Sequence, residues 1–178
     1  MFGILLRSTS FTSADLFADR NVQNNRFSIT TLAFNDLNTA NNYPIIRLFD
    51  ITGLVPGGFA VNSFRIKKTG QLNFKYNIFT EVISGDPSFC QSLEIQLMQN
   101  SIFKNQSGLT DFQYQSTIDT NIPQDWVIFL RLNQNNPPLR QQNCQFNLVI
   151  TTQDKNKPNG GLFARKTLLN SVTSGNWD

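Results

Sequence analysis

Residues 72–78 read LNFKYNI, and this stretch decides the class of fold. Its apolar residues, Leu72, Phe74, Tyr76 and Ile78, alternate with polar ones. A period of two places the two kinds on opposite faces of a β-strand, with one face buried and the other in water. We therefore expect Leu72, Phe74, Tyr76 and Ile78 to line the core of an antiparallel β-sheet.

Similar patterns mark strands along most of the chain. Further candidate strands are residues 27–34, 45–51, 59–66, 93–97, 126–132 and 146–150. The run WVIFLRL at 126–132 is apolar on both faces, which is typical of a strand in the middle of a sandwich or at an interface. Within 59–66 the apolar phase changes between Val61 and Phe64, which predicts a β-bulge.

Turn residues separate these strands, and helix signals are weak. Thr69-Gly70-Gln71 joins two alternating runs and predicts a tight hairpin. Residues 13–19 could form a short capped turn, and residues 108–119 are ambiguous. The chain has 178 residues, enough for one domain with its own core. We expect an all-β protein, a jelly-roll-like antiparallel β-sandwich with short helical or loop insertions.

Composition excludes several classes of function. The chain has no histidine, so catalysis by Ser-His or Cys-His pairs and zinc binding by histidine are ruled out. Its net charge is +3 with dispersed Lys and Arg, which argues against a nucleic-acid partner. The acidic residues are mostly turn aspartates, and no apolar run reaches the roughly 18–20 residues of a membrane span. We expect no enzyme, no cofactor and no catalytic or metal-binding residues.

The two cysteines, Cys90 and Cys144, are far apart in sequence and form no CxxC motif. An even pair at long spacing suits a disulfide in an oxidising compartment. The alternative is two separate buried thiols, which are common in cytosolic proteins. We predict the disulfide.

Several sequence blocks carry a family resemblance. In chain order they are residues 16–19 (LFAD), 24–27 (NNRF), 31–32 (TL), 54–57 (LVPG), 64–70 (FRIKKTG) and 144–153 (CQFNLVITTQ). In order and spacing they resemble the TasA/camelysin family of secreted prokaryotic biofilm-matrix fibre and pilus proteins. The resemblance covers most of residues 16–153. Some camelysins are described as metallo-endopeptidases, but this chain lacks HExxH and all histidine, so that activity does not carry over.

The resemblance implies an exported β-sandwich that assembles into fibres. In such fibres an N-terminal strand of one subunit completes the sheet of the next subunit. Residues 1–17 are apolar and rich in Ser and Thr, and have no evident place in a domain formed by residues 18–178. A strand from a neighbour would pair an otherwise unpaired sheet edge. The candidate donor strand is Gly3, Ile4, Leu5, Leu6, Arg7, Ser8, Thr9, Ser10 and Phe11.

Three functions stay open from the sequence. The first is a structural subunit of an extracellular fibre or pilus, with copies of itself and other matrix components as partners. The second is a monomeric secreted carbohydrate-binding or adhesin module on the same architecture, and the third is a secreted hydrolase. For residues 1–17 the alternatives are the remainder of a signal peptide or an unstructured tail.

Overall fold

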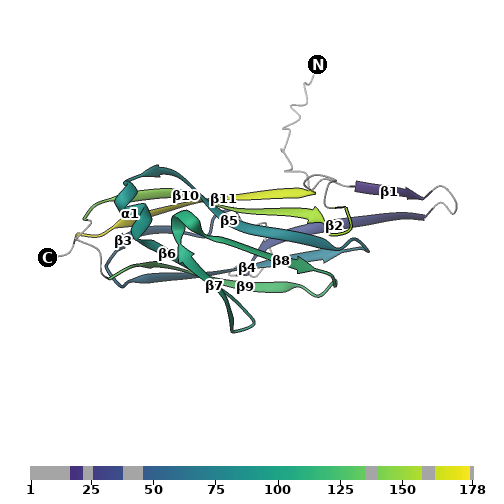
Figure 1. Ribbon diagram of the computed structural model, residues 1–178, viewed down its shortest axis with the longest axis horizontal. Helices are drawn as coiled ribbons and strands as arrows, with labels where there is room; N and C mark the ends of the chain where they lie inside the picture. Colours follow the sequence, from purple (N-terminus) through teal and green to yellow (C-terminus); the bar gives the residue numbers. More distant parts are fainter. Residues whose placement is uncertain (1–16, 22–25, 38–45, 135–139, 158–162, 177–178) are drawn as a thin grey trace, which may run out of the picture.

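A computed structural model describes residues 17–21, 26–37, 46–134, 140–157 and 163–176 of the chain. These residues form a β-sandwich of two sheets stacked face to face and elongated along the strands (Figure 1). The all-β sandwich expected from the sequence is therefore confirmed. The candidate donor strand, Gly3 to Phe11, lies outside the described residues.

The first sheet has six strands in the order β1-β2-β4-β9-β6-β7, all neighbours being antiparallel. Its strands are β1 (Phe17–Asn21), β2 (Arg26–Asp36), β4 (Phe59–Thr69), β9 (Gln124–Leu132), β6 (Leu93–Gln99) and β7 (Ile102–Gly108). The doubly apolar strand β9 lies between β4 and β6, so its predicted central position is confirmed.

The second sheet has five strands in the order β3-β11-β10-β5-β8. Its strands are β3 (Asp50–Leu54), β11 (Ala164–Ser174), β10 (Asn143–Asp154), β5 (Phe74–Gly85) and β8 (Gln113–Ile118). Among the described pairings, only that of β3 with β11 is parallel. Two short helices, α1 (Pro87–Ser92) and the 3₁₀ turn η1 (Leu109–Asp111), connect the layers.

The core lies between the sheets and is built by the alternating strands. Phe74, Tyr76 and Ile78 are at most 1% exposed, and Leu72 packs against them from the edge of the core. Tyr76 and Tyr114 both meet the ring of Trp126 edge-on, with centroids 6.2 and 5.4 Å away. The period-two prediction for residues 72–78 is thus confirmed.

The predicted hairpin at Thr69-Gly70-Gln71 is wrong. The strand before it, β4, belongs to the six-stranded sheet and the strand after it, β5, to the five-stranded sheet. Gly70 has φ of +96°, a conformation that glycine adopts readily. The turn therefore carries the chain from one sheet to the other. This crossing lets the apolar residues of β4 and those of β5 face each other across the core.

Two strand predictions need correction. In β4 the register with β9 runs from Phe59 to Ile66 without a shift, so the predicted bulge is absent there. Phe59 and Val61 lie on the outer face of the sheet, whereas Phe64 and Ile66 face the core. The strand predicted over residues 45–51 begins only at Asp50.

Helix α1 was not among the elements predicted from the sequence. The side chain of Asp86 accepts a hydrogen bond from the Phe89 N–H at 2.8 Å, and Pro87 occupies the first turn. An Asp N-cap followed by proline is a helix-start signal, so the sequence did contain it. The short capped turn predicted over residues 13–19 is wrong for its described part, because Phe17 to Asp19 belong to strand β1.

The structure contains the predicted disulfide between Cys90 of α1 and Cys144 of β10. The two Cα atoms are 5.4 Å apart, and both side chains are buried. The bond fastens α1 to the end of the five-stranded sheet.

One ion pair on the outer face of the six-stranded sheet predicts a pH dependence. Arg65 and Asp125 lie opposite each other in β4 and β9 and share two hydrogen bonds, of 2.6 and 2.8 Å. Hydrogen bonding from Arg65 lowers the pKa of the Asp125 carboxyl. In the unfolded chain this carboxyl has a pKa near 4, so the ion pair stabilises the fold at pH values above about 4. This stabilisation is lost as the pH falls through the lower pKa of the folded state.

We therefore expect a double-mutant cycle of Arg65→Gln and Asp125→Asn to give a coupling free energy at pH 7 that disappears near pH 2. Because the pair is partly exposed to solvent, the coupling should be at most about 1 kcal/mol. Urea unfolding at the two pH values measures it. An equal coupling at both would contradict the assignment.

Candidate functional site

One edge of the five-stranded sheet is only partly paired. Strand β11 pairs with β10 from Ala164 to Thr173. On its other side β3 pairs only with Ser171, Val172 and Ser174. Within the described part of the chain, no strand covers the outer side of residues 164–170. We call this segment the β11 edge.

The backbone of the β11 edge is oriented for a further strand. The N–H of Ser171 points away from β10 and donates to the Phe49 carbonyl at 3.0 Å. Because backbone groups alternate along a strand and the β10–β11 register is unbroken, Arg165, Thr167 and Leu169 also direct their N–H and C=O groups outward. Unpaired edges of this kind are templates for pairing with another chain.

The buried side chain of Asn170 ends the pairing with β3. Its Oδ1 accepts the N–H groups of Leu48 and Phe49 at 3.0 and 2.9 Å, and its Nδ2 donates to the Leu168 carbonyl at 2.7 Å. Since a side chain takes these N–H groups, they cannot donate to a neighbouring strand, and β3 begins at Asp50. This explains why the strand predicted from residue 45 is shorter, and why the β11 edge stays open.

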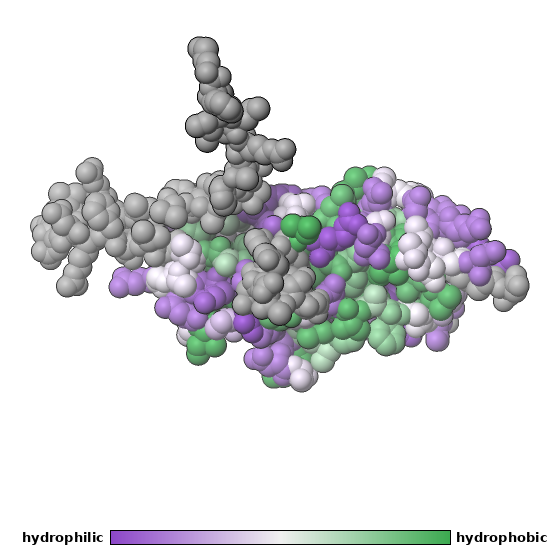
Figure 2. Space-filling model, turned by 180° about the vertical axis from the view of Figure 1, so that it is seen from behind, coloured by the Kyte–Doolittle hydropathy of each residue, from purple (hydrophilic) through white to green (hydrophobic). Residues whose placement is uncertain are grey.

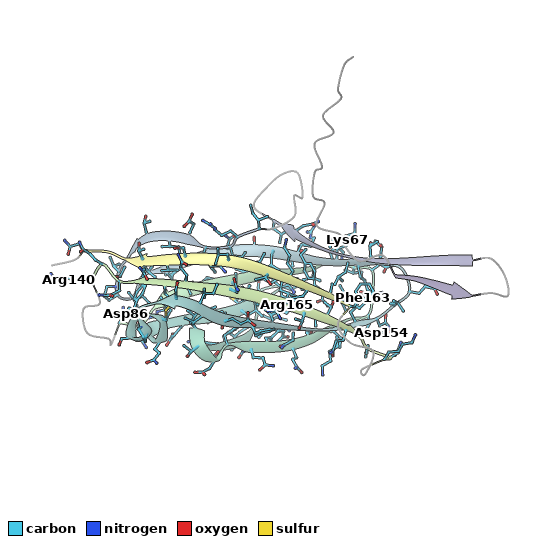
Figure 3. The ribbon with its side chains drawn as sticks, turned by 90° about the horizontal axis from the view of Figure 1, so that it is seen from above. Lys67, Asp86, Arg140, Asp154, Phe163 and Arg165 are labelled. Carbon is cyan, nitrogen blue, oxygen red and sulfur yellow. A yellow bond between two sulfur atoms is a disulfide. The ribbon has the colours of Figure 1, made fainter. Side chains whose placement is uncertain are left out.

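The charges next to the β11 edge are turned away from it. Arg165 donates to both carboxylate oxygens of Glu81 at 3.1 Å and lies over the ring of Phe79, across the outer face of the sheet. Lys166 is in the core-facing row beside the buried Leu168, and this burial lowers the pKa of its ammonium group. Figure 3 shows Arg165 and Phe163 toward the end of the sandwich from which the β1–β2 ribbon projects, with Asp86 and Arg140 at the other end.

The six-stranded sheet is also open on this side. Strand β1 pairs only with residues 26–30 of β2, whereas β4 pairs with Thr31 to Asp36. Among the described residues, the outer side of Thr31 to Asp36 is therefore unpaired, and β1 with the first half of β2 forms a two-stranded ribbon beyond the sandwich (Figure 1). At the other side the edge strands β7 and β8 follow each other through η1. The two open edges thus share one side of the sandwich.

The site residues expected from the sequence fall into two groups. The cysteines form a structural bond, and Gly3, Ile4, Leu5, Leu6, Arg7, Ser8, Thr9, Ser10 and Phe11 lie in the part of the chain that is not described. The described ranges contain no group of three or more Cys, Asp or Glu placed to hold a metal ion. They also contain no helix long and apolar enough to cross a membrane.

Sequence reasoning missed β11 altogether, and with it the β11 edge. Its core-facing row is Ala164, Lys166, Leu168, Asn170 and Val172, in which a lysine and an asparagine interrupt the apolar pattern. The apolar residues Leu168 and Val172, each two positions from Asn170, were the signal in the sequence that could have predicted this strand.

No protein-family model and no curated protein matches the chain. Among solved structures it is similar to the CooA pilin subunit of enterotoxigenic Escherichia coli, at 9% identity over 82% of this chain and 99% of that chain, with a TM-score of 0.47. It is similar to a mutant of the adhesin CfaE of the same bacterium, at 9% identity over 83% of this chain and 49% of that one, with a TM-score of 0.49. A family 123 glycoside hydrolase from Clostridium perfringens matches at 6% identity over 83% of this chain and 27% of its own, with a TM-score of 0.47. The chain thus spans about half of the adhesin and about a quarter of the hydrolase.

Proposed function

We propose that the protein is a structural, non-enzymatic subunit of an extracellular fibre or pilus, and that subunits join when the N-terminal segment of one pairs with the β11 edge of the next. The single observation that carries the proposal is the outward-facing backbone of residues 164–170 beside the shortened β3. The sequence resemblance to the TasA/camelysin family supports it, as does the disulfide, which suits a secreted protein.

The physical basis is strand addition. The nine residues from Gly3 to Phe11 are long enough to pair with the β11 edge, and Ile4 and Leu6 share one face of an extended strand. That face would extend the core-facing row next to Leu168, while main-chain hydrogen bonds form with Thr167 and its neighbours. Because the donor and acceptor surfaces differ, each added subunit offers a new acceptor, and the contact propagates into a filament.

Two changes test the proposal from its two sides. Deletion of residues 1–16 removes the donor, and Thr167→Pro removes an outward N–H of the acceptor, at a position where an edge strand tolerates proline. We expect both proteins to fold, as judged by circular dichroism and thermal unfolding, and to stay as single particles in negative-stain images. The matched control Thr167→Val keeps the N–H and should form filaments like the wild type.

A synthetic peptide of residues 1–16 should also stop the growth of wild-type filaments by occupying the acceptor edge. Filaments of normal length from the deletion variant would refute the donor role. A wild-type protein that stays monomeric at high concentration would refute the fibre function as a whole and favour the monomeric adhesin.

A further inference from the structure

The outer face of the six-stranded sheet carries a shallow depression that the fibre proposal does not use. It has a volume of about 360 Å³, near the lower end of the roughly 300–1,000 Å³ typical of ligand sites. Strands β4, β9, β6 and β7 contribute its main lining residues, Phe59, Phe129, Arg131, Glu94, Gln96 and Gln106. It lies in the interior of the sheet, away from the β11 edge.

One half of the depression is aromatic. Phe59 is 64% exposed, and its ring lies 6.4 Å from that of Phe129 at an angle of 46°. Val61, directly opposite Phe129 in the register, is 48% exposed. Figure 2 shows hydrophobic surface interspersed with hydrophilic residues on the side of the molecule turned away in Figure 1. The exposed ring of Phe59 and the half-buried ring of Phe129 would gain free energy when a ligand with an apolar face covers them.

The other half is polar and already arranged. The Glu94 carboxylate accepts hydrogen bonds from Asn133 Nδ2 at 3.2 Å and from Gln106 Nε2 at 3.4 Å. Arg131 lies opposite Glu94 in the register and forms no ion pair with the described residues. A fixed carboxylate acceptor thus lies beside a guanidinium group whose donors are available.

These groups limit the class of ligand. A nucleic acid needs several cations, and here the single arginine is next to a carboxylate that repels phosphate. An extended peptide binds through unpaired backbone at a sheet edge, whereas the backbones of β9 and β6, which carry Phe129, Arg131 and Glu94, are paired on both sides at this position. A pyranose ring offers both an apolar C–H face and neighbouring hydroxyl groups, each of which is a donor and an acceptor.

We propose that this depression binds a neutral saccharide. The sugar ring packs on Phe59 and Phe129, while two neighbouring hydroxyls bind the pair of charged groups, one donating to Glu94 and the other accepting from Arg131. The site would give the subunit an affinity for polysaccharide that is independent of polymerisation, because none of its lining residues belongs to β11.

The experiment measures binding of the full-length chain to cellohexaose, maltohexaose, mannohexaose and trigalacturonate by calorimetry and by saturation-transfer NMR. We expect at least one neutral hexasaccharide to bind. Phe59→Ala should weaken binding roughly tenfold, and Arg131→Ala and Glu94→Gln roughly tenfold to a hundredfold, since each removes a stacking surface or a charge-assisted hydrogen bond.

The matched control is Phe103→Ala, which removes an exposed phenylalanine of β7 outside the depression and should leave the affinity unchanged. Unfolding curves of all variants establish that they are folded. The proposal is wrong if no neutral hexasaccharide binds, if only trigalacturonate binds, or if Phe59→Ala and Phe103→Ala affect binding equally. None of these outcomes depends on filament formation, so this proposal and the fibre proposal can fail separately.

Discussion

Phe74→Ala is expected to lower the free energy of unfolding by about 3–5 kcal/mol, the usual cost of a large-to-small change in a packed core. The Phe74 side chain is fully buried, and its ring lies 4.5 Å from that of Phe163, where the β10–β11 connection meets the core. Removing it leaves a cavity between the two sheets that the paired strands cannot close by moving. Urea unfolding followed by tryptophan fluorescence measures the change.

Lys75→Ala is the matched control, because Lys75 is the next residue of β5 and points to solvent. Its effect should stay within about 0.5 kcal/mol. Equal losses for the two variants would contradict the assignment of the core face, on which the register of β5 with β8 and β10 depends.

Removing the disulfide is expected to have a comparable effect. The chain-entropy model gives about 4 kcal/mol for a bond that closes a loop of this length, since Cys90 and Cys144 are separated by 54 residues. The bond also fastens α1 to β10, so its loss should free the helix first. The double substitution of Cys90→Ala and Cys144→Ala, studied by thermal and urea unfolding, tests this expectation.

Reduction of the wild-type protein provides the control. A reductant should lower the stability of the wild type toward that of the double variant and leave the variant unchanged. The mass of the oxidised protein should be two hydrogens below that of the reduced form. Two thiols that react with an alkylating reagent in the unfolded, unreduced protein would show that the bond is absent.

Local pattern alone determined much of the architecture. A period of two at residues 72–78, 93–97 and 146–150 identified core-facing rows, because burial on one face of a strand leaves a direct trace in the sequence. The apolar run of β9 identified the middle of a sheet, and the spacing of the two cysteines led to their pairing.

The tertiary structure alone decided how the strands combine and where the molecule is open. Gly70 could have closed a hairpin or crossed between layers, and only the packing of the opposed apolar rows selects the crossing. The apolar phase changes between Val61 and Phe64, as it would at a β-bulge. Because β4 is regular there, the change instead leaves Phe59 and Val61 on the outer face of the sheet, beside Phe129. The β11 edge depends on Asn170, whose amide takes two N–H groups from a segment more than a hundred residues away. Such a contact leaves no periodic trace in the sequence, because its energy comes from one buried polar group that is satisfied only when the chain has folded.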